Sequence, residues 1–173
     1  MASYFAAAIA TACDISGAAA APAAKPTDPQ IAHIVYTADN LDIENAKQAL
    51  DKSKNEQVRN FAQRMIGDHT SVNDQALVLV KKLNVTPEDN DTSKALTQAA
   101  ADERAKLDKL DGAAFDKAYV ENEVAYHKQV NGALETLLIP SAENAELKSL
   151  LETGLKLFQG HQQHAEHVAM ELK

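Results

Sequence analysis

Residues 53–74 read SKNEQVRNFAQRMIGDHTSVND, and they combine a helical apolar period with polar residues that interrupt it. Phe61, Met65 and Val72 recur at the three- and four-residue steps that place side chains on one face of a helix. Ser53 and Glu56 have the spacing of a capping box, in which each side chain satisfies a free backbone amide. This spacing predicts a helix that begins at Ser53, directly after the preceding one.

The rest of the chain shows the same period in four further segments. Asp28 and Pro29 are typical of a helix start and predict a helix over 28–52. The other breaks predict a helix around Leu96 that Asp111 and Gly112 end, a helix from about Ala113, and a last helix that Pro140 and Ser141 begin. Aromatic residues are only 5% of the 173 and there is no Trp. We therefore expect an all-α, antiparallel helical bundle of four long helices plus one additional helix.

The first 27 residues differ in composition from the remaining 28–173, which we expect to form the bundle. Residues 1–13 read MASYFAAAIATAC, an apolar run too short to span a bilayer, and an Ala/Pro tether follows it. The run resembles an export signal, although no Lys or Arg precedes Lys25. Cys13 is the only cysteine, and the residues before it resemble a lipobox, so it is a candidate membrane tether. Cleavage, lipidation and retention all stay open, and a periplasmic or cell-envelope location follows from the first two.

The charge balance restricts the partners. The formal net charge is -8 and no basic run exceeds two residues. Nucleic-acid binding depends on clustered Lys and Arg, so we expect no nucleic-acid partner. Cations are better suited to a surface with this negative net charge. The sequence does not decide whether the chain forms a homo-oligomer.

Several polar residues fall on the apolar faces of the predicted helices. Asp68 lies between Met65 and Val72, with His69 beside it; His127 and His161 take similar places in their helices. At about 100° per residue, His161 points inward, His164 lies at the edge and His167 points to solvent. A buried acid without a partner is costly, and facing helices hold transition metals with imidazoles and carboxylates. The predicted metal ligands are therefore Glu44, Asp68, His69, His127, His161 and His164.

Three segments together resemble a known family. They read NEQVRNFAQRMIGDHTSVND, LDGAAFDKAYVENEVAYHKQV and ELKSLLETGLKLFQGHQQHAEHV. They are similar to the bacterial exported family catalogued as domain of unknown function 4142, which implies a ferritin-like bundle in the cell envelope. The resemblance also implies a polar core at the positions of Glu44, Asp68, His69, His127 and His161. It implies no particular reaction.

The chain departs from di-iron carboxylate proteins at the decisive motif. Those proteins use Glu-x-x-His pairs, but Ile66, Val124 and Phe158 stand three residues before the candidate histidines. Glu123 is four residues before His127, which puts it on the same face with a different geometry. The histidine-rich set therefore predicts Zn, Cu or a single Fe rather than a bridged iron pair.

Three functions are compatible with these residues. The first is an exported bundle that binds a transition metal, in envelope metal handling or protection against oxidative stress. The alternative is a structural or assembly-forming envelope protein whose histidines form a hydrogen-bonded polar layer. An enzyme with His127 or His161 as general base and Asp68 as its orienting group comes third, because no nucleophile or cofactor motif accompanies them. The sequence thus favours a role without catalysis.

Overall fold

The computed structural model describes residues 25–172, and these residues are almost entirely helical. The long helices are α2 (Asp28–Lys52), α3 (Glu56–Lys82), α4 (Asp91–Leu107), α5 (Gly112–Ala133) and α7 (Ala145–Glu171). A π-helical turn, η1 (Leu134–Leu138), and the short α6 (Ile139–Ser141) connect α5 to α7. The predicted signal-like run and Cys13 lie outside the described residues, so their fate stays a prediction.

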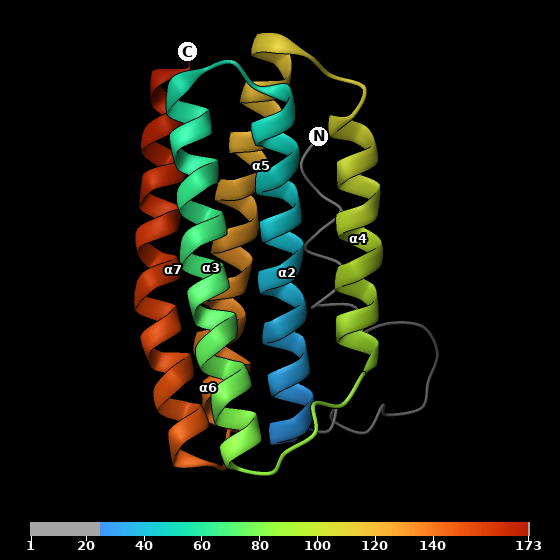
Figure 1. Ribbon diagram of the computed structural model, residues 1–173, viewed down its shortest axis with the longest axis vertical. Helices are drawn as coiled ribbons and strands as arrows, with labels where there is room; N and C mark the ends of the chain where they lie inside the picture. The colour runs from blue at the N-terminus through green and yellow to red at the C-terminus, as the bar shows by residue number, and fades with distance from the viewer. Residues whose placement is uncertain (1–24, 173) are drawn as a thin grey trace, which may run out of the picture.

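Four of the long helices form an antiparallel bundle. Helices α2 and α3 pack side by side, α5 packs on α7, and the two pairs meet through α3 with α7 and α2 with α5 (Figure 1). Helix α4 lies outside this bundle, against α2, and is the additional helix that the sequence predicts. The all-α, antiparallel prediction is confirmed.

The helix ends correct four details of the sequence interpretation. Helix α3 begins at Glu56, because the side-chain oxygen of Asn55 accepts the backbone N–H groups of Gln57 and Val58. Ser53 instead ends α2, so the predicted capping box is wrong. In the same way Asn144, not Ser141, caps α7, because its side-chain oxygen accepts the backbone N–H groups of Glu146 and Leu147.

The other two details concern Asp28 and the end of α4. Thr27 is the N-cap of α2, and Asp28 is its first residue. The carboxylate of Asp28 accepts the backbone N–H groups of Glu143 and Asn144, which ties the start of α2 to the start of α7. Helix α4 ends at Leu107, and Gly112 begins α5 with a φ of 54°, a conformation that favours glycine.

The interior consists of two apolar cores. The upper core, in the orientation of Figure 1, joins the end of α2, the start of α3 and α5, and the end of α7; its largest members are Phe61, Met65, Phe115 and Tyr119. The lower core joins the opposite ends of these helices and includes Ile31, Leu134, Leu151 and Phe158. Along each of the four helices, buried polar residues lie between these two sets. We call these residues the polar layer: Asp39, Asp42, His69, Glu123, His127 and His161.

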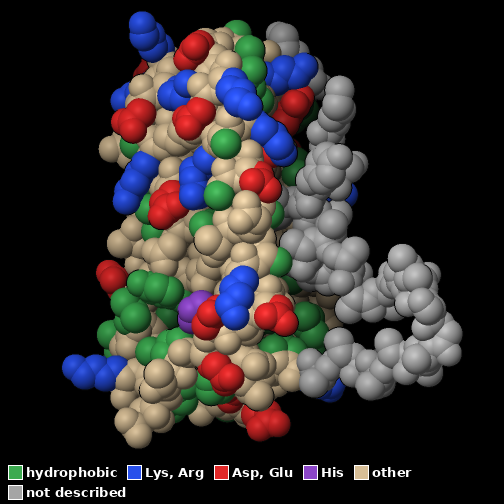
Figure 2. Space-filling model, turned by 90° about the vertical axis from the view of Figure 1, so that its right-hand side faces the viewer, with side chains coloured by type: hydrophobic (Ala, Val, Ile, Leu, Met, Phe, Trp, Pro, Cys, Tyr) green, Lys and Arg blue, Asp and Glu red, His purple; other side chains and the backbone are tan. Residues whose placement is uncertain are grey.

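The surface carries charges of both signs. On the face that shows α4, Lys and Arg side chains are interspersed with Asp and Glu, without a continuous basic patch (Figure 2). Among the described residues, no helix has the length and apolarity needed to cross a bilayer.

Candidate metal centre

Three buried histidines meet at the centre of the polar layer. His69 on α3, His127 on α5 and His161 on α7 are 2%, 1% and 0% exposed. Their ring centroids form a nearly equilateral triangle, with separations of 5.7, 5.2 and 5.4 Å. One ring nitrogen from each lies within 4.8 Å of the other two. Imidazoles from three helices are thus held close enough to share one ion.

Each imidazole is fixed from outside by one hydrogen bond. His69 Nδ1 donates to Asp39 Oδ1 at 2.8 Å, His127 Nδ1 to the Glu123 carbonyl oxygen at 3.0 Å, and His161 Nε2 to Asp68 Oδ2 at 2.8 Å. Carbonyl and carboxylate oxygens only accept, so these three nitrogens carry the protons. Metal-binding histidines are usually oriented in this way by a second hydrogen bond.

The second nitrogen of each ring lies opposite these bonds. His69 Nε2, His127 Nε2 and His161 Nδ1 are buried, and none makes a well-aligned hydrogen bond within the described residues. Burial lowers the pKa of His127, and it lowers the pKa of His161 to about 4. Both rings are therefore neutral at pH 7, and each has a lone pair on its unbonded nitrogen. A lone pair on neutral imidazole is what a transition metal binds.

Two carboxylates complete the inner side of the layer. Asp42 and Glu123 are both 0% exposed, and none of their four oxygens makes a well-aligned hydrogen bond within the described residues. Asp42 Oδ2 lies 2.6 Å from His69 Nε2 and 3.8 Å from His127 Nε2. A second group of ligand atoms, from Asp42, Glu123 and His127, also lies within 4.8 Å. The two groups share His127, whose Nε2 lies on the side of Asp42 and whose Nδ1 lies 3.6 Å from Glu123 Oε2.

The charges of the layer are divided unequally. Burial raises the pKa of Glu123 well above its ordinary value, and the charge of Asp42 raises it further, so both favour the protonated form of Glu123. Burial acts against ionisation of Asp42 too, but the charge of His69 outweighs it and lowers the pKa of Asp42. Burial likewise opposes protonation of His69, yet the Asp42 charge and the bonds with Asp39 and Asp42 raise its pKa to about 10. Without a metal, the layer thus holds one imidazolium, His69, between the acids Asp39 and Asp42.

The structure separates the predicted ligands into two sets. His69, His127 and His161 come together as predicted, and Asp68 lies behind His161, one-third exposed, with Arg64 3.3 Å away. Glu44 points away from the layer, and its carboxylate pairs with Arg104 Nη2 at 3.1 Å. It lies three residues after Leu41, which is about 300° around the helix and therefore short of a full turn. His164 packs edge-on against Phe61 in the upper core, with ring centroids 5.2 Å apart. His167 is exposed, as predicted.

Sequence reasoning missed Asp39 and Asp42. The signal was present for Asp42, because Ala38, Asp42 and Ala46 follow one another at four-residue steps along the buried face of α2. An aspartate flanked by two buried alanines at helical spacing must point into the bundle. Asp39 lies beside this series and is buried only because His69 of α3 faces it.

The comparisons with known proteins agree with the resemblance seen in the sequence. No curated protein and no solved structure gives a significant match. The ferritin-like assignment of the fold accordingly stays a prediction. The profile of one family, described as a domain of unknown function (DUF4142), matches residues 14–168. The chain belongs to this DUF4142 family.

Proposed function

We propose that the bundle binds one transition-metal ion through Asp42, His69, Glu123, His127 and His161. The observation that carries this proposal is the closeness of three buried imidazoles from three helices, whose ligand nitrogens lie within 4.8 Å of one another around one buried point. His127 Nε2 and His161 Nδ1 have no hydrogen-bond partner among the described residues, while the other nitrogen of each ring is bonded to an acceptor. Buried polar atoms without partners are costly, and an ion at this point would satisfy the nitrogens and both carboxylates at once.

The donor set indicates the class of metal. Three imidazoles with two carboxylates, and no sulfur, suit Fe(II), Zn(II) or Cu(II) better than the soft Cu(I) ion. Two ionised carboxylates and three neutral imidazoles carry two negative charges, so a divalent ion leaves the buried site neutral. Binding would displace the protons that His69 and Glu123 hold in the metal-free protein.

A structural role for the same residues is the second candidate. His69 lies 2.8 Å from Asp39 and 2.6 Å from Asp42, and its raised pKa makes it an imidazolium between two acids. Such a buried ion pair would hold α2 on α3 without any metal. It does not account for His127 Nε2 and His161 Nδ1, which are buried nitrogens of neutral rings without a hydrogen-bond partner among the described residues.

The biological setting that we propose follows the family and the signal-like first residues. The protein is exported to the cell envelope, as a ferritin-like bundle, and there takes part in metal handling or protection against oxidative stress. Residues 1–13 support export through their apolar run, and Cys13 supports a lipid tether. Membrane fractionation of the wild type and of Cys13→Ser tests the tether. If the tether exists, the wild type is found in the membrane fraction and the variant in the soluble fraction.

Metal content tests the proposed site. Untagged protein purified without added metal should contain close to one Zn, Cu or Fe per chain by elemental analysis. His69→Ala/His161→Ala should lose the metal, and His127→Ala should lower the content. His167→Ala and Glu44→Gln are matched controls, because both side chains are exposed and outside the layer, and they should keep the metal. A wild-type protein that stays metal-free when the ions are supplied would exclude the metal site. The structural role would then remain as the function of these residues.

A further inference from the structure

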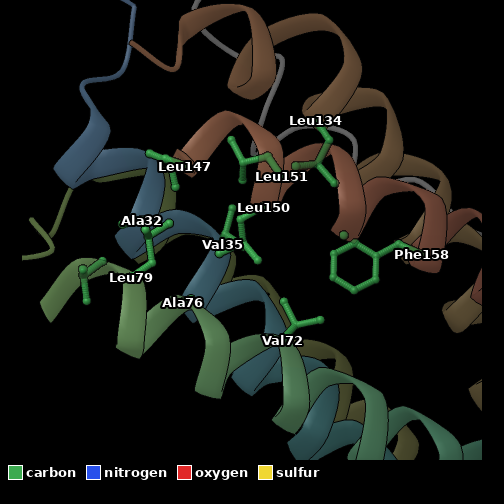
Figure 3. A pocket seen from close by; sticks show the side chains of 12 residues that line it. Ala32, Val35, Val72, Ala76, Leu79, Leu134, Leu147, Leu150, Leu151 and Phe158 are labelled. Atoms are coloured by element: carbon green, nitrogen blue, oxygen red, sulfur yellow. The ribbon is translucent and has the colours of Figure 1, made fainter. Parts of the chain in front are cut away.

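An apolar cavity of about 20 Å³ lies in the lower core, next to the polar layer. Its walls come from α2, α3, η1 and α7, and every side chain that lines it is apolar (Figure 3). Val35 and Val72 face Leu151 across it, and Phe158 closes the end. The space is about the volume that one water-sized molecule occupies.

Phe158 is the only lining residue that also has a described ring contact with the histidines. Its ring stacks on His69, with centroids 4.8 Å apart and planes inclined by 10°, and lies 5.9 Å from His161. Gly154, one helical turn earlier, also lines the cavity. A Cβ at Gly154 would lie 3.5 Å from the Phe158 ring, so a larger side chain there would enter the cavity or press on that ring. One aromatic ring therefore separates the cavity from the proposed metal ligands.

We propose that this cavity binds a small uncharged apolar molecule of the size of dioxygen. The absence of polar groups from its lining excludes ions and hydrogen-bonding ligands, and apolar cavities of proteins stay dry and take up xenon or hydrocarbons. The volume corresponds to one small molecule. The relevance of a gas molecule at this place rests on the metal centre proposed above, whereas its uptake does not require the metal.

Xenon and dioxygen are the probes for this site. In methyl-labelled protein, xenon should shift the resonances of Val72 and Leu151 in a saturable way, while those of Val58 in the upper core stay unchanged. Dioxygen is paramagnetic, so under oxygen pressure it should raise the methyl relaxation rates of Val72 and Leu151 several-fold over that of Val58. Equal effects in both cores, or non-saturable shifts, would overturn the proposal.

Two leucine substitutions on the same helix provide the variant and its control. Gly154→Leu should fill the cavity and abolish the xenon shifts. Gly160→Leu places the same side chain where a Cβ meets no atom within 4 Å, and it should leave the shifts intact. Ala76→Leu, which also enters the cavity, serves if Gly154→Leu does not fold. Xenon uptake is measured on EDTA-treated protein and metal content on untreated protein, so the two proposals fail separately: no xenon uptake contradicts only the cavity, and an untreated chain that takes up no metal contradicts only the metal site.

Discussion

The upper core and the polar layer occupy neighbouring levels of the same four helices, yet they contribute to the fold in opposite ways. In the upper core, Phe61, Met65 and Tyr119 are fully buried and in mutual apolar or aromatic contact, which stabilises the helices without any ligand. In the polar layer, Asp42 and Glu123 are equally buried, but their oxygens lack aligned partners. Burial therefore stabilises the first level and costs free energy at the second unless an ion is bound.

Truncation of the upper core should have the largest effect. Phe61→Ala removes a fully buried ring and should lower the free energy of unfolding by about 3–5 kcal/mol. Urea unfolding measures this, and the loss should be the same with and without metal. Tyr36→Ala removes an exposed aromatic side chain and should stay within about 0.5 kcal/mol of the wild type. A loss that depends on metal would show that the two levels are not independent.

Removal of the metal should have the next largest effect, and it should act through the polar layer alone. At a free metal concentration one hundred times the dissociation constant, binding stabilises the folded state by about 2.7 kcal/mol. Thermal unfolding with metal and with EDTA should show this difference in the wild type and in Phe61→Ala. It should be absent in His69→Ala/His161→Ala, and its persistence there would place the metal elsewhere.

The metal-free polar layer should weaken at alkaline pH. The pKa of His69 is about 10 in the folded chain, against 6.5 for an ordinary histidine. The stabilisation is complete below the unfolded value and is lost as pH rises toward 10, because the unfolded chain releases its proton first. The slope is at most about 1.4 kcal/mol per pH unit. Urea unfolding of EDTA-treated protein from pH 7 to 9 should show this loss in the wild type but not in His69→Gln.

An apolar replacement should reverse the usual cost of a buried substitution. Glu123→Met keeps a similar volume and removes two buried oxygens without aligned partners, so the metal-free protein should gain about 1–3 kcal/mol. The same variant should bind metal more weakly. Both quantities come from urea unfolding with EDTA and from metal titration. A metal-free protein destabilised by this change would mean that Glu123 supports the fold as part of a hydrogen-bonded layer.

The smallest effect should come from His164. Its ring meets Phe61 edge-on and lies outside the histidine triangle, so His164→Ala should cost about 1 kcal/mol in lost aromatic contact. Its metal content should equal that of the wild type. A fall in metal content would restore His164 to the ligand set that the sequence predicts.

The candidate site could be predicted in part because a helix fixes the direction of its own side chains. His127 and His161 fall between apolar residues at helical spacing, so their inward direction followed from the period alone. The partners of each ring did not follow, because they come from other helices. Asp39 becomes a hydrogen-bond acceptor only when α3 brings His69 to it, and Glu44 pairs with Arg104 of α4 although it lies three residues after the buried Leu41.

The sequence by itself determined the all-α class, the number of long helices and the buried faces on which His69, His127 and His161 lie. These properties depend on residues a few positions apart, where helical geometry is fixed. Only the tertiary structure decided which nitrogen of each histidine faces inward, which acid stays protonated, and that a cavity lies behind Phe158. Each of these depends on the distance between side chains of different helices, and the helical period does not specify how those helices are rotated against one another.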